Sequence, residues 1–124
     1  MLTQQHTVLP AADLQRLRGF YHDKFGLDPR EEMGNGEVLV YGDGDIAFEA
    51  YRTEYAGTAK NTQMGWMTDD LDAEMRRLRD AGVEFLDFET EGMKTENGVA
   101  EGDGIRSAWF QDTEGNTVCI TQRL

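Results

Sequence analysis

Two stretches of the chain place apolar residues every three or four positions, a pattern that predicts amphipathic helices. They lie within residues 13–26 and 69–82. Asp13 favours the start of the first helix, and Gly26 and Gly82 favour the ends of the two helices. The apolar stripes consist of Leu14, Leu17, Tyr21 and Phe25 in the first helix and Leu71, Met75, Leu78 and Ala81 in the second.

The other patterned segments are short and predict strands. Alternation of apolar and polar residues is clearest in 45–52 and 116–122. The segment 91–104 predicts a long loop, and loops of that length in a small domain are often binding elements. We expect strands at residues 2–9, 31–34, 37–42, 45–52, 63–68, 83–88, 104–111 and 116–122.

The order of strand, helix and three strands therefore occurs twice, and the repeat extends to single residues. His6 lies seven positions before Asp13, and Gln63 lies seven positions before Asp70. The two halves are thus related by a constant offset of 57 positions, from 6 to 63 and from 13 to 70. Such self-similarity predicts a duplicated βαβββ unit.

Size and charge limit the classes of partner. The chain has 124 residues, which suits one domain, and 24 acidic against 12 basic residues give it a net charge of −12. This charge repels phosphate backbones and attracts cations, so we expect no nucleic-acid partner. The sequence has no apolar run of the roughly 18 to 20 residues that a membrane span needs, and no secretory signal is visible. We expect a cytoplasmic protein with no membrane partner.

Three segments together resemble a known family. They are HTVLPAADLQRLRGFYHDKFGL (6–27), QMGWMTDDLDAEMRRLRDAGVEF (63–85) and RSAWFQDTEGNTVCITQ (106–122), the last containing F-x-D-x-x-G-N. The sequence resembles the glyoxalase / bleomycin-resistance / dioxygenase superfamily, also called the vicinal oxygen chelate superfamily. The resemblance implies a single α+β domain, residues 1–124, with two paired βαβββ modules (1–56 and 57–124). Their sheets would form a curved cup around a small molecule.

The implied fold predicts which strand residues line the cup. Side chains alternate along a strand, so one set faces the helices and the other faces inward. We expect Ile46, Phe48, Ala50, Met64, Trp66, Val118 and Ile120 on the helix side. We expect His6, Val8, Ala47, Glu49, Tyr51, Gln63, Gly65, Met67, Thr117, Cys119 and Thr121 to face the cup.

The resemblance also implies candidate site residues. The four positions that hold a divalent metal in many family members fall on His6, Glu49, Gln63 and Cys119. His6 and Glu49 suit zinc, nickel, iron or manganese, and Gln63 is a weaker oxygen donor. The family pattern has glutamate where this chain has Cys119, so a hard ligand and a common catalytic base are both missing. We therefore expect no resident metal and treat His6, Glu49 and Gln63 as the alternative metal set.

Further residues are candidates for contact with a ligand rather than for chemistry. Tyr51 and Trp109 can stack on a ligand, and Met67, Gln63 and Cys119 line the predicted cup. The predicted loop is long enough for Lys94 and Thr95 to reach over the mouth of the cup as a lid.

Three functions remain open from the sequence. The first is metal-free binding of a small molecule, such as a cationic drug-like compound or metabolite. The second is a metal-dependent lyase, isomerase or dioxygenase that uses His6, Glu49 and Gln63. The third is metal-independent acid–base catalysis by His6 and Glu49. Small two-module chains of this family commonly pair, so we also expect a homodimer.

Overall fold

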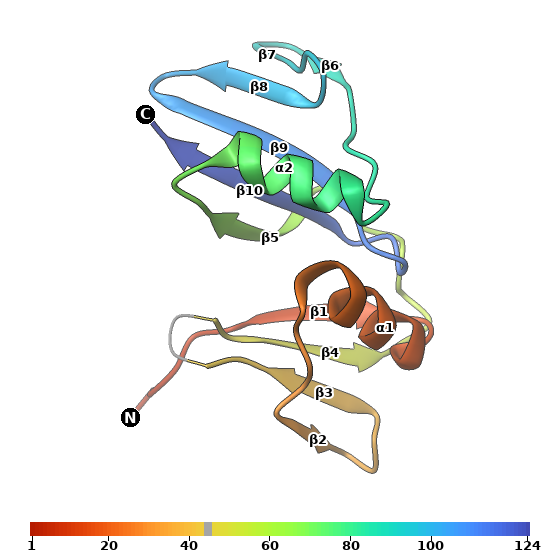
Figure 1. The fold of residues 1–124 in the computed structure, drawn as a ribbon. Helices are drawn as coiled ribbons and strands as arrows, with labels where there is room; N and C mark the ends of the chain where they lie inside the picture. The colour runs from red at the N-terminus through yellow and green to blue at the C-terminus, as the bar shows by residue number, and fades with distance from the viewer. Residues whose placement is uncertain (44–45) are drawn as a thin grey trace.

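The computed structural model describes residues 1–43 and 46–124 and contains two four-stranded sheets (Figure 1). The first sheet has the strand order β1-β4-β3-β2, with β1 and β4 parallel and the remaining pairs antiparallel. The first sheet and its helix comprise β1 (Thr7–Ala11), α1 (Leu14–Phe25), β2 (Glu31–Met33), β3 (Val38–Tyr41) and β4 (Phe48–Arg52).

The second sheet repeats this topology in the order β5-β10-β9-β8, again with only the pair nearest the centre, β5 and β10, parallel. A separate short hairpin, β6 with β7, is inserted after the second helix. The elements are β5 (Thr62–Met67), α2 (Leu71–Asp80), β6 (Glu89–Thr90), β7 (Met93–Lys94), β8 (Val99–Gly102), β9 (Ile105–Gln111) and β10 (Thr117–Arg123). The predicted α+β class and duplicated strand order are confirmed.

Local sequence explains both helices. The side chains of Asp13 and Asp70 each accept a backbone N–H from the residue three positions further on, and so cap the helix starts. Gly26 ends α1 at φ 66°, a left-handed conformation that glycine adopts without a Cβ clash. At the end of α2 the N–H of Val83 donates to the carbonyl of Leu78, as in a Schellman ending.

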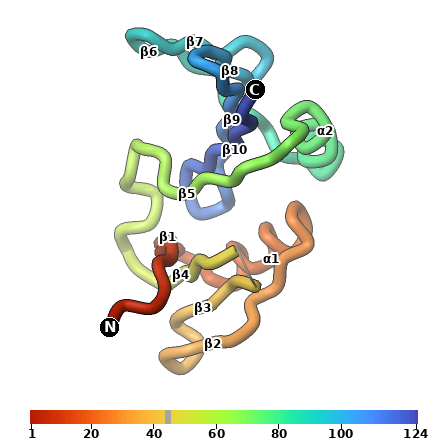
Figure 2. The backbone as a smooth tube through the Cα atoms, turned by 90° about the vertical axis from the view of Figure 1, so that its left-hand side faces the viewer, coloured from red at the N-terminus to blue at the C-terminus, as the bar shows by residue number. Residues whose placement is uncertain are grey.

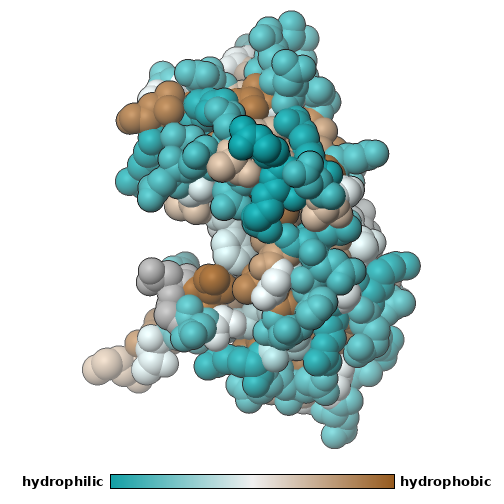
Figure 3. All heavy atoms as spheres, in the orientation of Figure 1, coloured by the Kyte–Doolittle hydropathy of each residue, from teal (hydrophilic) through white to brown (hydrophobic). Residues whose placement is uncertain are grey.

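Both helices cover the same face of the paired sheets, as Figures 1 and 2 show from perpendicular directions. The hairpin β6–β7 lies toward the opposite face, which we call the open face. β1 and β5, the inner edge strands, contact one another at the seam between the halves. The helix side seen in Figure 3 is largely hydrophilic, and the surface is hollowed at one edge of this seam.

The core lies between the helices and the sheets. Phe48, Ala50, Met64, Val118 and Ile120 are all buried there, as their alternation predicts, whereas Val8, Tyr51 and Met67 are exposed on the other side. Aromatic rings continue the core across the seam, including a stack of Phe25 on Trp66 with centroids 5.8 Å apart. The remaining buried apolar residues are Leu9, Ala11, Leu14, Leu17, Tyr21, Leu39, Tyr41, Leu71, Met75, Leu78, Val83, Ala108 and Phe110.

The motif near the C-terminus joins the two halves. Asp112 accepts hydrogen bonds from the Tyr21 hydroxyl at 2.9 Å and from the Asn116 amide at 2.9 Å, and Asn116 also donates to the Pro10 carbonyl. Glu114, whose side chain is fully buried, accepts from Arg16 and from the backbone N–H of Asp13 at the start of α1. The D-x-E-G-N segment is therefore a polar link between β10 and the first half.

Two predicted boundaries in the second half are wrong. Residues 83–88, expected as a strand, form only a single bridge, between Phe85 and Phe110. Val83 and Phe85 pack with the core, whereas Phe88 packs on Trp109, so the segment forms no continuous ladder. The outer strand of the second sheet is instead β8, which lies inside the predicted loop 91–104. In the first half, the strand expected over 2–9 begins at Thr7. The N-terminal end of the strand expected at 45–52 lies partly outside the described residues.

Candidate functional site

His6 and Glu49 come together on the open face of the first sheet. Their side chains approach to 3.5 Å between Nε2 and Oε1, and both are partly open to solvent. His6 immediately precedes β1, and Glu49 projects from β4 beside it. Together with Gln4 and Arg30 they border a hollow of about 260 Å³. The sequence-predicted pair is thus a real contact within one chain.

The strand register relates Glu49 to Cys119. Val8 pairs with Glu49 in the first sheet, and Gly65 pairs with Cys119 in the second. Val8 and Gly65 are themselves related by the offset of 57 positions that the sequence repeat predicts. Glu49 and Cys119 therefore occupy equivalent sites in the two halves, as His6 and Gln63 do by their spacing.

Gln63 and Cys119, however, bond within the second sheet. The Gln63 side chain donates to Asn116 Oδ1 at 3.0 Å and accepts the Thr117 N–H at 3.1 Å. Cys119 Sγ lies 3.4 Å from the Thr121 hydroxyl, which in turn bonds to Ser107. Among residues 1–43 and 46–124, no hydrogen bond or ion pair links either residue to His6 or Glu49.

These contacts do not fit the metal set of the family. Over the described part of the chain, no group of three or more His, Cys, Asp or Glu side chains is placed to hold a metal ion. His6 and Glu49 supply two donors, and both polar groups of the Gln63 amide already have protein partners. A zinc ion generally has at least three protein ligands, and the described part of one chain does not bring them together here.

A second hollow lies on the open face of the second half, beneath the hairpin β6–β7. We call it the hairpin hollow; its volume is about 270 Å³. Met93 of the hairpin, Ile105 and Trp109 form its apolar walls, Ser107 contributes a hydroxyl, and Glu101 and Asp103 stand at its rim. Ser107 and Trp109 share a face with Thr121 and Cys119, because they are paired across β9 and β10.

Trp109 is held in a defined orientation. Its indole N–H donates to the Thr62 hydroxyl at 3.1 Å, and the ring packs edge-on against Phe88 with centroids 5.1 Å apart. One end of the ring is thereby fixed by β5 and the other by the segment that leads into the hairpin. A ring fixed in this way can stack on a planar ligand with little loss of side-chain entropy.

The remaining predicted contacts are placed differently. Met67 is 61% exposed and borders a hollow of about 660 Å³ at the seam, beside Gly65 and Ala47. Tyr51 is exposed on β4, away from Trp109. Of the predicted lid, Lys94 borders the hairpin hollow, whereas Thr95 is buried and bonded to Asp87, so it anchors the hairpin.

Met93 and Ile105 were not identified from the sequence. Met93 lies among glycines and charged residues in the predicted loop 91–104, whereas Ile105 lies in the strand predicted at 104–111. The available signal for Met93 was an apolar residue inside a polar loop, a combination that often indicates a binding element.

The segment that contains the hairpin β6–β7 is strongly negative. Residues 83–104 contain seven carboxylates and one lysine, a net charge of −6. Hydrogen bonds from the Gly98 N–H and the Thr95 hydroxyl lower the pKa of Asp87 within this segment. Because the field of several like charges adds up, a cation is drawn toward this part of the surface.

Comparison with known proteins agrees with this architecture. The family model of the Glyoxalase/Bleomycin resistance protein/Dioxygenase superfamily matches residues 3–120, and the protein belongs to this superfamily. No curated protein gives a significant match.

No helix in the described part of the chain is long and apolar enough to span a membrane.

Several solved structures share the fold. TnmS3, an antibiotic binding protein from Streptomyces sp. CB03234, is 20% identical, with a TM-score of 0.67 over 100% of this chain and 98% of that one. A glyoxalase / bleomycin resistance protein from Catenulispora acidiphila is 17% identical, with a TM-score of 0.69 over 97% of both chains. FosX, a fosfomycin resistance protein from Listeria monocytogenes, is 13% identical, with a TM-score of 0.70 over 100% and 95%.

Proposed function

We propose that the protein binds a small, planar cation in the hairpin hollow, without a resident metal. The observation that carries this proposal is the combination of an oriented Trp109 with an acidic rim formed by Glu101 and Asp103. The ring of the ligand would lie against Trp109 and the apolar side chains of Met93 and Ile105. Its positive charge would lie near the rim carboxylates.

The strength of such a site follows from its parts. A cation over an aromatic ring contributes about 0.5–2 kcal/mol, depending on how much water is removed. Carboxylates at an exposed rim add little affinity, because solvent screens them, but they raise the rate of encounter with a cation. Affinity would therefore depend mainly on Trp109 and its apolar neighbours, and charge selectivity on the rim.

The relatives support a binding role. TnmS3 is described as antibiotic-binding and FosX as a fosfomycin resistance protein. At 20% and 13% identity, these relatives support the idea that this fold can bind small molecules, but they do not indicate a particular ligand. The engaged Gln63 amide further favours binding without a metal over a metal-dependent lyase, isomerase or dioxygenase.

The contact between His6 and Glu49 favours a second candidate function. A histidine beside a carboxylate can exchange a proton with a ligand held in the adjoining hollow, and the carboxylate can orient the imidazole ring. This metal-independent acid–base role would require both side chains. Loss of turnover in both His6→Gln and Glu49→Gln, with folding unchanged, would support it once a substrate is found.

We also propose that the protein is a cytoplasmic homodimer. The lone cysteine is free, which suits a reducing compartment such as the cytoplasm.

The case for a dimer comes from the open face, where Val8, Tyr51 and Met67 are 46%, 40% and 61% exposed. Apolar surface of this kind is often covered by a partner subunit. Light scattering coupled to gel filtration at several concentrations tests the pairing, and a mass of one chain throughout contradicts it.

The binding proposal can be tested with a pair of matched ligands. Titration calorimetry would compare 9-aminoacridine, a planar cation at neutral pH, with acridine, its neutral counterpart. We expect the cation to bind more tightly and Trp109→Ala to weaken it by about tenfold. Tyr55→Ala serves as the control, since Tyr55 is an exposed aromatic that does not border the hairpin hollow. Equal binding by both variants, or no heat from either ligand, would contradict the proposal.

A further inference from the structure

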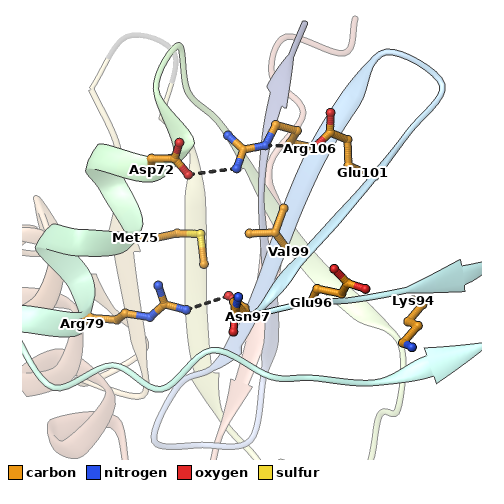
Figure 4. A pocket seen from close by; sticks show the side chains of 9 residues that line it. All are labelled: Asp72, Met75, Arg79, Lys94, Glu96, Asn97, Val99, Glu101 and Arg106. Atoms are coloured by element: carbon orange, nitrogen blue, oxygen red, sulfur yellow. Dashed lines mark hydrogen bonds and ion pairs between the residues drawn. The ribbon is translucent and has the colours of Figure 1, made fainter.

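A groove of about 570 Å³ lies between α2 and the strands β8 and β9 (Figure 4). We call it the helix groove. Glu101 pairs with Arg106, and Val99 pairs with Ala108, which is buried on the helix side of the sheet. The groove therefore lies on the side of the sheet opposite the hairpin hollow. The two hollows meet at the sheet edge, where Lys94 and Glu101 border both, and their other lining residues differ.

One end of the helix groove has excess negative charge. Arg106 donates to Asp72 at 2.9 Å and lies 3.6 Å from Glu101. Two carboxylates thus face a single guanidinium, and Figure 4 shows Arg106 placed between them. Arg106 holds the pKa of Asp72 below its usual value. The net charge at this end is −1.

The other end has excess positive charge. Arg79 projects from the last turn of α2, donates to the Asn97 carbonyl at 2.8 Å and lies over the Phe85 ring. Lys94 and Glu96 border the same end. Two cations face one carboxylate, a net charge of +1. Within residues 1–43 and 46–124, neither Arg79 nor Lys94 forms a salt bridge.

An apolar belt separates the two ends. Met75 from α2 and Val99 from β8 face each other across the middle of the groove. Asp72, Met75 and Arg79 follow one another along one side of α2, and seven helical residues span about 10 Å. The groove thus presents negative charge, apolar surface and positive charge in sequence along that length.

We propose that the helix groove binds a linear zwitterion with an apolar centre. The ammonium group would lie beside Asp72 and Glu101, the carboxylate beside Arg79 and Lys94, and the apolar chain across Met75 and Val99. An ω-amino acid and a short apolar peptide share this chemistry and a suitable length. Trp109 borders the hairpin hollow alone, and Asp72 and Arg79 border the helix groove alone, so variants at these residues test the two proposals separately.

The test uses the full-length protein and ¹H–¹⁵N NMR titration. The probes are 6-aminohexanoate, hexanoate, hexylamine and trialanine. We expect saturable shifts in the amides of α2 and β8 with 6-aminohexanoate, and affinities about two- to fivefold weaker for hexanoate and hexylamine, each of which lacks one charge. Tighter binding of trialanine than of 6-aminohexanoate would assign the site to peptides, and the reverse to ω-amino acids.

Variants locate the two charges. Asp72→Asn and Arg79→Gln are each expected to weaken 6-aminohexanoate about two- to fivefold, while Asp80→Asn, exposed on the same helix outside the groove, leaves it unchanged. Arg79→Lys keeps the charge and should restore most of the affinity if loss in Arg79→Gln is electrostatic. Binding of hexanoate equal to that of 6-aminohexanoate, shifts confined to residues that do not border the groove, or no saturable shift with either zwitterion overturns the proposal.

Discussion

Glu49 and Cys119 occupy equivalent places in the two sheets. Each is paired in a parallel ladder with a residue of the first strand of its half, Val8 or Gly65, and those partners are 57 positions apart. In the first half this place holds a carboxylate in contact with His6. In the second half it holds a thiol in a row of hydroxyl groups. The duplicated fold thus carries two chemically different sites.

The role of Gln63 as a structural bridge is testable. Gln63→Glu would replace the amide that donates to Asn116 Oδ1 with a second acceptor, while the bond from the Thr117 N–H is kept. We expect a loss of about 1–2 kcal/mol in the free energy of unfolding, measured by urea denaturation. Gln111→Glu, on the exposed end of β9, is the control and should change stability little. A Gln63→Glu protein as stable as the wild type would contradict these bonds.

The buried Glu114 predicts loss of stability in acid. Burial alone would raise its pKa, but hydrogen bonds from Arg16, the Asp13 N–H and Thr113 outweigh this and lower it to about 2, from 4.5. Because the folded-state pKa is the lower one, the carboxylate stabilises the fold above about pH 4.5, and this contribution is lost as the pH falls toward 2. We expect Glu114→Gln to be less stable by up to about 3 kcal/mol at pH 7 and to have a flatter pH profile between 5 and 2.

Burial raises the pKa of the neighbouring Asp112, which works in the opposite direction over part of this pH range. The quantity to compare is therefore the difference in the free energy of unfolding between wild type and Glu114→Gln, measured by chemical denaturation at each pH. Glu32→Gln is the control, because Glu32 pairs with Arg18 on the surface. Such exposed pairs contribute about 0–1 kcal/mol. Parallel pH profiles for wild type and Glu114→Gln would contradict the prediction.

Loss of the hydroxyl group should change stability differently at two buried tyrosines. Tyr21 donates to Asp112 at 2.9 Å, so Tyr21→Phe leaves a buried carboxylate with one donor fewer and is expected to cost about 1–2 kcal/mol. The Tyr41 hydroxyl is buried without a hydrogen-bond partner in the described part of the chain. Tyr41→Phe should therefore be neutral or slightly stabilising. Thermal and urea unfolding check both, and equal losses would contradict the assignment.

Gly98 should be the critical glycine of the hairpin segment. Its φ is +83°, and a Cβ there would lie 2.9 Å from the Phe85 Cβ. Gly92 has a similar φ of +85° but open space around it. We expect Gly98→Ala to destabilise by about 2–4 kcal/mol and Gly92→Ala by about 1 kcal/mol, because only the first adds a steric clash to the backbone strain. Unfolding measurements showing equal losses would contradict this difference.

The amino-acid sequence by itself determined the two helices, the inward and outward faces of the strands and the duplication, since each depends on residue periodicity or on a spacing along the chain. Asp13 and Gly26 bound the first helix as predicted, and Val118 and Ile120 are buried as predicted. The contact of His6 with Glu49 was also expected, because strand alternation and the family resemblance place both side chains on the inner face.

Only the tertiary structure decided which segment completes the second sheet and what the polar groups at its centre bond to. The alternation of apolar and polar residues in β8 is weak, and this segment is a strand because it pairs with the edge of β9. Val83 and Phe85, from the segment that was expected to form this strand, pack with the core instead. Gln63 is engaged by Asn116 and Thr117, which are more than fifty positions away. Hydrogen bonds between distant segments have no local period, so the sequence pattern carries no sign of them.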